Sequence, residues 1–214
     1  MKACWLGGAG VALRGGDIRI MVDPVLTREE QLRALDILGG SPDVLILTHT
    51  HPDALDIDSV EAALSGTSVT VLASEGAYER VKELGGEHNY VLLEPGSVWS
   101  TMGVTFYAVP SAHSDRTAIG VIADDGHSTY YFSGDTLYNY DVIDACLELA
   151  PDGVDVAFLP ISGRDCNMNA KDAADFAYEI SAGVAVPVRH GSASPRDFDF
   201  EDALVLTPFE VREL

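Results

Sequence analysis

The chain has 214 residues, of which 47% are hydrophobic and 22% charged, and its formal net charge is -21 at pH 7. This hydrophobic fraction excludes a disordered chain, and the length predicts one domain over residues 1–214. The negative charge argues against nucleic acids and anionic membranes as partners, because phosphate groups are bound by clusters of lysine and arginine. A small anionic substrate stays compatible, since a bound dication reverses the local field.

The first part of the chain predicts short strands joined by glycine turns, with Gly15-Gly16 as a hairpin signal. Thr27 and Glu30 form a capping box that predicts a helix ending at Gly39-Gly40. The expected strands here are 2–6, 11–14, 18–22, 44–48 and 68–73. Two further helices are expected, one starting at Asp58 and ending near Gly66, and one over 75–84.

The second part repeats this order. The expected strands are 90–93, 98–102, 104–109, 119–123, 129–133, 154–159 and 184–188, and the tail within 204–212 supplies one more. Helices are expected over 140–149 and, after Asn169 as cap, over 170–181. Each part runs from hairpin strands into alternating strands and helices, which predicts two packed sheets with helices outside them.

Cysteine usage and the N-terminus bear on location. The three cysteines are widely spaced and include no C-x-x-C pair, so a disulfide framework is not expected and a cytoplasmic location is. Residues 1–6 are too short an apolar run for a signal peptide. The chain contains no apolar stretch of the roughly 20 residues that span a bilayer.

Two histidines and an aspartate follow the apolar run 44–47. Residues two apart in an extended segment point to the same side, so His49 and His51 direct their imidazoles to one point beyond the strand end. Asp53 joins them if the chain turns at Pro52. Two histidines and a carboxylate that converge at a strand end predict a metal site.

Three further residues of the types that bind metals follow predicted strands. His113 comes after 104–109, Asp135 after 129–133, and His190 after 184–188. A single histidine at a strand end is more often structural. Ligand sites in layered α/β folds gather at strand ends, so the four places together predict one shared site.

These residues carry a resemblance to a known family. The order H-x-H-x-D, a later His, S-G-D-T at 133–136 and a final His resembles the metallo-β-lactamase fold hydrolases. Residues 5–10, 22–24 and 48–49 resemble the branch related to ascorbate-6-phosphate lactonase. The match covers nearly the whole chain and implies an α/β fold, an αβ/βα four-layer sandwich of two mixed β-sheets with helices on the outer faces.

The resemblance also implies the metal ligands. The first metal would be bound by His49, His51 and His113, the second by Asp53 and His190, and Asp135 would bridge the two. The family has another histidine directly after the aspartate, where this chain has Ala54. Three explanations stay open: the second metal binds weakly, water replaces the missing ligand, or one metal suffices. A site rich in oxygen ligands accepts Mn²⁺ as well as Zn²⁺.

The ligands predict a hydrolytic mechanism. A bound dication lowers the pKa of water from about 15.7 to about 7. Asp53 is expected to orient that water and pass its proton to the leaving group, and His190 is the second expected catalytic residue.

Other polar residues are expected around this site. Arg164, Asn167 and Arg189 are the expected substrate-binding residues, with a surface ion pair as the alternative for Arg164. Asp23 and Asp56 are expected to support the ligands from outside, although Asp56 can also donate an oxygen to the metal or open a helix, and Asp23 can simply brace the sheet.

The expected function is metal-dependent hydrolysis of a small soluble substrate, by resemblance a lactone or a phosphorylated sugar acid. One alternative is a phosphodiesterase or nuclease of the same superfamily, against which the net charge of -21 counts. The other is a non-catalytic metal-binding scaffold, which Ala54 motivates. Superfamily relatives that self-associate leave a homo-oligomer open.

Overall fold

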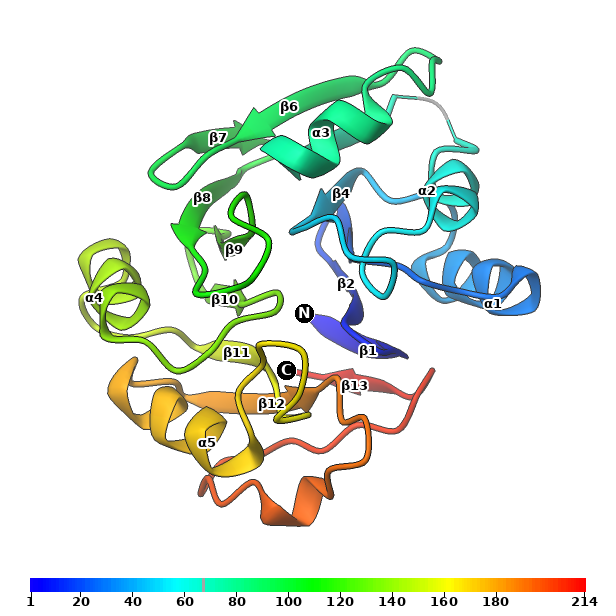
Figure 1. The fold of residues 1–214 in the computed structure, drawn as a ribbon. Helices are drawn as coiled ribbons and strands as arrows, with labels where there is room; N and C mark the ends of the chain where they lie inside the picture. The colour runs from blue at the N-terminus through cyan, green and yellow to red at the C-terminus, as the bar shows by residue number, and fades with distance from the viewer. Residues whose placement is uncertain (67) are drawn as a thin grey trace. The chain divides into compact units, whose positions relative to one another are not determined.

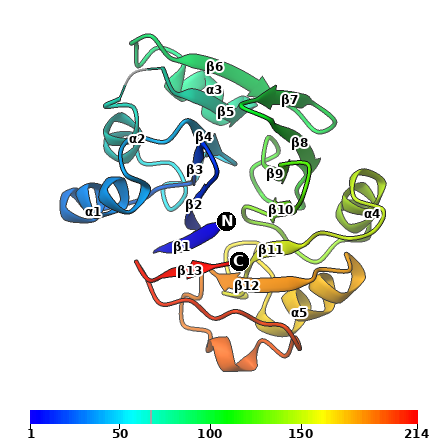
Figure 2. The same cartoon turned by 180° about the vertical axis from the view of Figure 1, so that it is seen from behind.

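Two mixed β-sheets carry the fold, one in each of two units of the chain (Figures 1 and 2). The structure is a computed structural model that describes all residues except Thr67. Unit 1 comprises Met1–Leu93 and Leu206–Leu214, and unit 2 comprises Glu94–Val205. The prediction of two mixed sheets with helices is confirmed.

Unit 1 holds a seven-stranded sheet in the order β13-β1-β2-β3-β4-β5-β6. Its strands are β1 (Lys2–Gly7), β2 (Gly10–Gly15), β3 (Ile18–Val22), β4 (Val44–Leu47), β5 (Thr70–Ser74), β6 (Asn89–Leu93) and β13 (Val211–Glu213). Neighbouring strands from β13 to β3 pair antiparallel, and those from β3 to β6 pair parallel. The helices are α1 (Arg28–Leu38), α2 (Ile57–Ala63) and α3 (Glu75–Val81).

Alternating side chains of these strands bury one face of the sheet under the helices. Leu45 and Leu47 of β4 belong to the same buried cluster as Leu38 of α1, Val60 of α2 and Ala77 of α3. All four residues of β4 are fully buried, as expected for a parallel strand inside a sheet. The apolar run that precedes the histidine motif is therefore a central strand.

Side-chain caps define where helices α1 and α2, which pack on this strand, begin. The capping box of α1 is confirmed: the Thr27 hydroxyl oxygen accepts from the Glu30 N–H, and Glu30 Oε2 accepts from the Thr27 N–H at 2.8 Å. The predicted start of α2 at Asp58 is wrong. Asp56 is the N-cap, because its backbone is extended and its Oδ2 accepts from the Ser59 N–H at 2.9 Å.

Unit 2 holds a six-stranded sheet in the order β12-β11-β10-β9-β8-β7. Its strands are β7 (Val98–Thr101), β8 (Val104–Pro110), β9 (Ile119–Asp124), β10 (Thr129–Phe132), β11 (Val156–Pro160) and β12 (Val184–Val188). Helices α4 (Tyr140–Leu149) and α5 (Ala170–Glu179) share a buried cluster with strand residues, in which Tyr131 stacks on Phe176 with ring centroids 6.2 Å apart.

A few predicted bounds differ from the observed ones. Helix α3 ends at Val81 and not at residue 84, because the next residues form a turn in which the Leu84 N–H bonds the Val81 carbonyl. Helix α5 ends at Glu179, two residues early, where Ser181 takes a left-handed φ of 51°. In the tail only β13 is a strand of the sheet, and residues 204–207 are not.

Strand direction sets where the polar loops emerge. In unit 1, β3 and β4 are parallel, so the residues after both strands leave the same edge of the sheet. In unit 2, β10, β11 and β12 are parallel, and β8 runs with β10 because both are antiparallel to β9. The segments after β8, β10, β11 and β12 therefore share one edge, which is where ligand sites form in such sheets.

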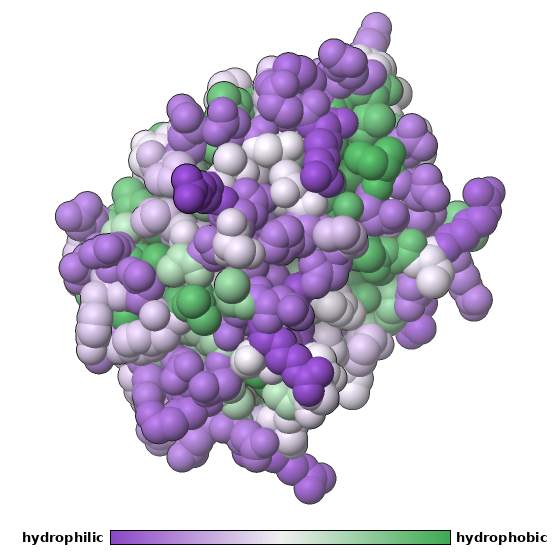
Figure 3. Space-filling model, in the orientation of Figure 1, coloured by the Kyte–Doolittle hydropathy of each residue, from purple (hydrophilic) through white to green (hydrophobic). Residues whose placement is uncertain are grey.

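The face drawn in Figure 3 is largely polar. Figure 3 shows mainly hydrophilic side chains on the face it draws, with smaller hydrophobic areas between them. Isolated apolar side chains are exposed, such as Leu32 at 65% and Tyr140 at 67%. Among the described residues, no helix has the length and apolar character that crossing a membrane requires.

We expect Gly153→Ala to destabilise unit 2. Gly153 has a φ of 93°, and a Cβ added there would lie 2.3 Å from the carbonyl oxygen of Ser181. The left-handed backbone and the clash together should lower the free energy of unfolding by about 3 kcal/mol, which a urea titration measures. Gly126→Ala is the matched control, because its φ is 81° but no described atom lies within 4 Å of the added Cβ. Equal losses in the two variants would contradict the role of the close contact.

Candidate metal centre

In unit 1 a buried carboxylate organises the end of β4. Asp23 follows β3, is 1% exposed and has a left-handed φ of 40°. Its Oδ1 accepts from the Thr48 N–H at 2.8 Å, and its Oδ2 accepts from the Thr48 hydroxyl at 2.5 Å. The expectation that Asp23 braces the sheet or the histidines thus has a definite geometry: it fixes the residue directly before His49.

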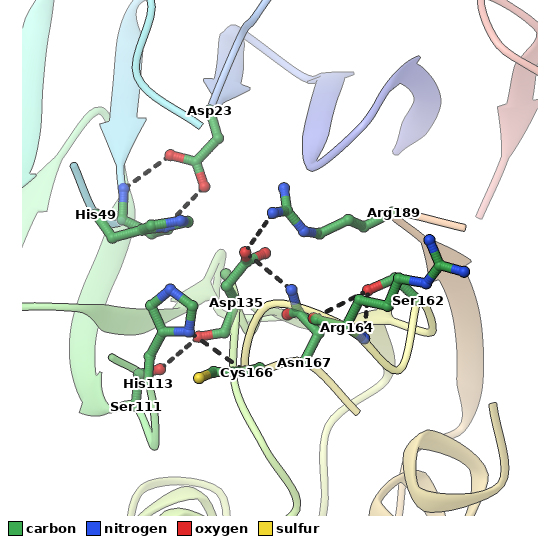
Figure 4. A network of polar contacts seen from close by, with 12 residues as sticks. Asp23, His49, Ser111, His113, Asp135, Ser162, Arg164, Cys166, Asn167 and Arg189 are labelled. Atoms are coloured by element: carbon green, nitrogen blue, oxygen red, sulfur yellow. Dashed lines mark hydrogen bonds and ion pairs between the residues drawn. The ribbon is translucent and has the colours of Figure 1, made fainter. Parts of the chain in front are cut away.

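This arrangement determines the tautomer of His49 (Figure 4). The Thr48 hydroxyl has one hydrogen, which it donates to Asp23, so at its 2.9 Å contact with His49 it acts as acceptor. His49 Nδ1 therefore carries the proton and Nε2 carries the lone pair. A second ring nitrogen held by a protein acceptor is the usual arrangement for a histidine that binds a metal.

His51 and Asp53 approach the same imidazole. The His49 and His51 rings meet edge to face with centroids 5.2 Å apart. Ligand atoms of His51 and of Asp53 each lie within 4.8 Å of a ligand atom of His49. The chain turns after Pro52 as predicted, since the N–H groups of Ala54 and Leu55 both bond the His51 carbonyl at 2.9 Å. Unit 1 thus gathers two imidazoles and one carboxylate at the end of β4.

In unit 2 a second buried carboxylate occupies the end of β10. Asp135 is 1% exposed, and its Oδ2 accepts from Asn167 Nδ2 at 3.0 Å and lies 2.8 Å from Arg189 Nη2 (Figure 4). The segment after β8 is tied to the same place, because the Ser111 hydroxyl donates to the Asp135 carbonyl at 2.6 Å. Loops that follow β8, β10, β11 and β12 thus meet around Asp135.

The histidines of unit 2 also have one nitrogen held by the protein. His113 Nδ1 lies 3.3 Å from the Cys166 carbonyl, and His190 Nε2 lies 2.9 Å from the Pro187 carbonyl. A carbonyl can only accept, so these two nitrogens carry the protons.

The loop 162–169 supplies the remaining polar residues. Two backbone hydrogen bonds hold this loop together. The Gly163 N–H donates to the Met168 carbonyl, and the Asn167 N–H donates to the Arg164 carbonyl, both at 2.9 Å. Asp165 and Cys166 have left-handed φ values of 52° and 59°, a strained conformation that recurs at functional sites. Arg164 is exposed at the loop tip, whereas Asn167 is buried on Asp135.

Comparison with known proteins identifies the family. Residues 18–190 match the family model of the β-lactamase superfamily domain. The chain belongs to this family. A UPF0173 metal-dependent hydrolase of Listeria monocytogenes is 30% identical over 209 residues, which cover 90% of this chain and 86% of that protein. One from Pyrococcus abyssi is 29% identical over the full length of both chains.

Solved structures show the same fold. The metallo-β-lactamase fold protein YhfI of Bacillus subtilis superposes with a TM-score of 0.78 over 99% of both chains, at 16% identity. The protein is therefore a metal-dependent hydrolase of the metallo-β-lactamase superfamily. The predicted superfamily and enzyme class are confirmed.

The residues of this metal-dependent hydrolase fit a divalent metal on donor chemistry. In unit 1 the Thr48 hydroxyl holds Nδ1 of His49 and Asp53 adds a carboxylate, and in unit 2 the Cys166 carbonyl holds Nδ1 of His113 and Asp135 adds a carboxylate. Imidazole and carboxylate ligands suit zinc and manganese alike. Asp56 differs from these ligands, since its Oδ2 also accepts from the Ser59 hydroxyl at 2.6 Å and so serves the start of α2.

Sequence reasoning missed two hydroxyls in this hydrolase. The Thr48 hydroxyl hydrogen-bonds both Asp23 and His49. The Ser111 hydroxyl hydrogen-bonds the Asp135 carbonyl and so holds the segment before His113 beside Asp135. Each lies one or two residues before a candidate ligand histidine, which is the signal that could have identified them. Arg189 and Asn167 were expected to bind substrate, but in the structure both side chains contact Asp135.

We expect Thr48→Val to weaken metal binding, because it removes the acceptor that fixes His49 Nδ1–H. Loss of such an outer partner typically lowers metal affinity roughly 10- to 100-fold. A competition titration against a chromophoric chelator measures the dissociation constant. Thr70→Val makes the same chemical change at the opposite end of the neighbouring strand β5, where Thr70 pairs with Val44. Equal affinities in the two variants would rule out the role given to the Thr48 hydroxyl.

Proposed function

We propose that this chain binds a divalent cation, Zn²⁺ or Mn²⁺. The family resemblance supports His49, His51 and Asp53 of unit 1 and His113 and Asp135 of unit 2 as its ligands. The observation that carries this proposal is the buried chain Asp23–Thr48–His49, in which the Thr48 hydroxyl donates to Asp23 and accepts from His49 Nδ1. One ring nitrogen held by a protein acceptor is the usual arrangement for a histidine that binds a metal, which supports this role for His49.

The proposed reaction is hydrolysis of a small soluble substrate. When bound, a divalent cation would supply a Lewis acid and would lower the pKa of water at the site. Asp53 is exposed and near His49, so its carboxylate can accept a proton from water and deliver it to the leaving group. His190 is the second candidate for proton transfer, since its ring is half-buried and its Nε2 is held by the Pro187 carbonyl.

We propose that the substrate is a lactone or a phosphorylated sugar acid that carries an anionic group. A chain with a net charge of -21 needs a local cation to attract such a molecule. Arg164 supports this role, because its side chain is exposed while its backbone is held by the closed loop 162–169. A planar guanidinium binds carboxylate or phosphate through two hydrogen bonds. Asn167 and Arg189, both engaged with Asp135, would act on the substrate only indirectly.

The function is tested with metal-loaded protein on matched panels of lactones, phosphorylated sugar acids and phosphodiesters. We expect the first two panels to be hydrolysed and His49→Ala to lower kcat/KM by at least about 100-fold, since a lost ligand costs more than a lost outer partner. His127→Ala is the control, because His127 lies exposed at the β9–β10 turn. The readout is product release followed by chromatography.

Three results would contradict parts of this proposal. Unchanged turnover in His49→Ala would remove the metal mechanism. Hydrolysis of phosphodiesters alone would favour the phosphodiesterase alternative. Stoichiometric metal together with no hydrolysis of any panel would favour a non-catalytic scaffold.

A further inference from the structure

A buried ion pair within unit 2 joins Asp135 to the residue that follows β12. Arg189 Nη2 lies 2.8 Å from Asp135 Oδ2, and the two side chains are 9% and 1% exposed. Figure 4 shows the guanidinium directed at the carboxylate, with Asn167 on the other side. Asn167 Nδ2 donates to the same oxygen at 3.0 Å. One carboxylate oxygen therefore serves two donors, one of them permanently charged.

The sheet holds this pair in place. Asp135 and Arg189 follow β10 and β12, which flank β11 in a parallel arrangement and so end at the same edge. Arg189 has a left-handed φ of 49°, which is unfavourable for any residue with a Cβ. A strained backbone at a buried cation persists only where the surrounding contacts stabilise it. The ion pair is such a contact.

The pair changes what Asp135 can bind. A carboxylate that bridges two dications is surrounded by positive charge on both metals. In this chain a guanidinium already contacts it, and a second dication on the same carboxylate would lie close to that fixed charge, in a buried region where repulsion is strong. The chain also lacks a donor for the second metal, because residue 54 is alanine. Both observations disfavour a second metal, and they are independent of each other.

We propose that Arg189 replaces the second metal ion: this hydrolase binds one divalent cation, and the guanidinium supplies the other positive charge at Asp135. Arg189 is then a positioning residue that orients the carboxylate toward the single metal. The inference rests on the proposed function, in which Asp135 is a metal ligand.

The test is metal stoichiometry, measured by elemental analysis after dialysis and by titration with Zn²⁺ or Mn²⁺. We expect one equivalent in the wild-type protein and in Arg189→Lys, which keeps the positive charge. Arg189→Met should bind a second equivalent at least tenfold more tightly than the wild-type protein does. Arg196→Met is the control, since Arg196 is exposed in the same unit and its loss changes the net charge equally.

Thermal unfolding of the metal-free protein gives a second readout. Removing one partner of a buried ion pair leaves an uncompensated charge, so Arg189→Met should lower Tm by about 10 °C without metal and by less with saturating metal. Two tight equivalents in the wild-type protein would overturn the inference and leave the proposed hydrolase intact, even if Arg189→Met does not fold. An Arg189→Met variant that matches Arg196→Met in second-metal affinity and in Tm would also overturn it. No metal in the wild-type protein would overturn both proposals.

Discussion

A carboxylate buried away from water must be satisfied by donors, and the polar residues at the strand ends of each unit follow this requirement. Asp23 in unit 1 accepts the backbone and hydroxyl donors of Thr48, while Asp135 in unit 2 accepts Asn167 and Arg189. The donors come from segments far away in sequence, which the parallel strands bring to one edge. The sheet topology brings these donors to each carboxylate, and the resulting hydrogen bonds and ion pair fix the positions of the side chains.

The two carboxylates differ in how they are compensated. Asp23 accepts from neutral donors, the backbone and hydroxyl of Thr48. The same hydroxyl contacts His49 Nδ1, so Asp23 helps to fix the orientation of the His49 ring. Asp135 uses a full positive charge, so its influence is electrostatic. The contacts of Asp23 in unit 1 thus fix an orientation, and those of Asp135 in unit 2 balance a charge.

Much of this architecture could be predicted from the sequence because it depends on local signals. The capping box at Thr27, the buried run 44–47 and the turn after Pro52 each follow from residues a few positions apart. The placement of candidate ligands after strands required only the alternation of apolar and polar segments.

The contacts of Asp135 could not be predicted in this way. Arg189 and Asn167 lie 54 and 32 positions beyond it in sequence, and either side chain could equally have pointed to solvent or substrate. Asp56 was ambiguous for a related reason, because an aspartate before a helix suits a cap and a ligand alike, and only the bond to Ser59 decides. Directions of long side chains depend on tertiary packing, which local patterns do not contain.

The backbone at Arg189 places two demands on one position. Glycine would adopt a φ of 49° without strain, yet only a long cationic side chain can reach Asp135. Glycine or asparagine there would relieve the backbone strain but would leave the buried carboxylate of Asp135 without its cation, so neither replacement is expected to stabilise the protein. Directed evolution of this scaffold for robustness should therefore retain Arg189, since relief of the backbone strain alone does not compensate for the loss of the buried ion pair.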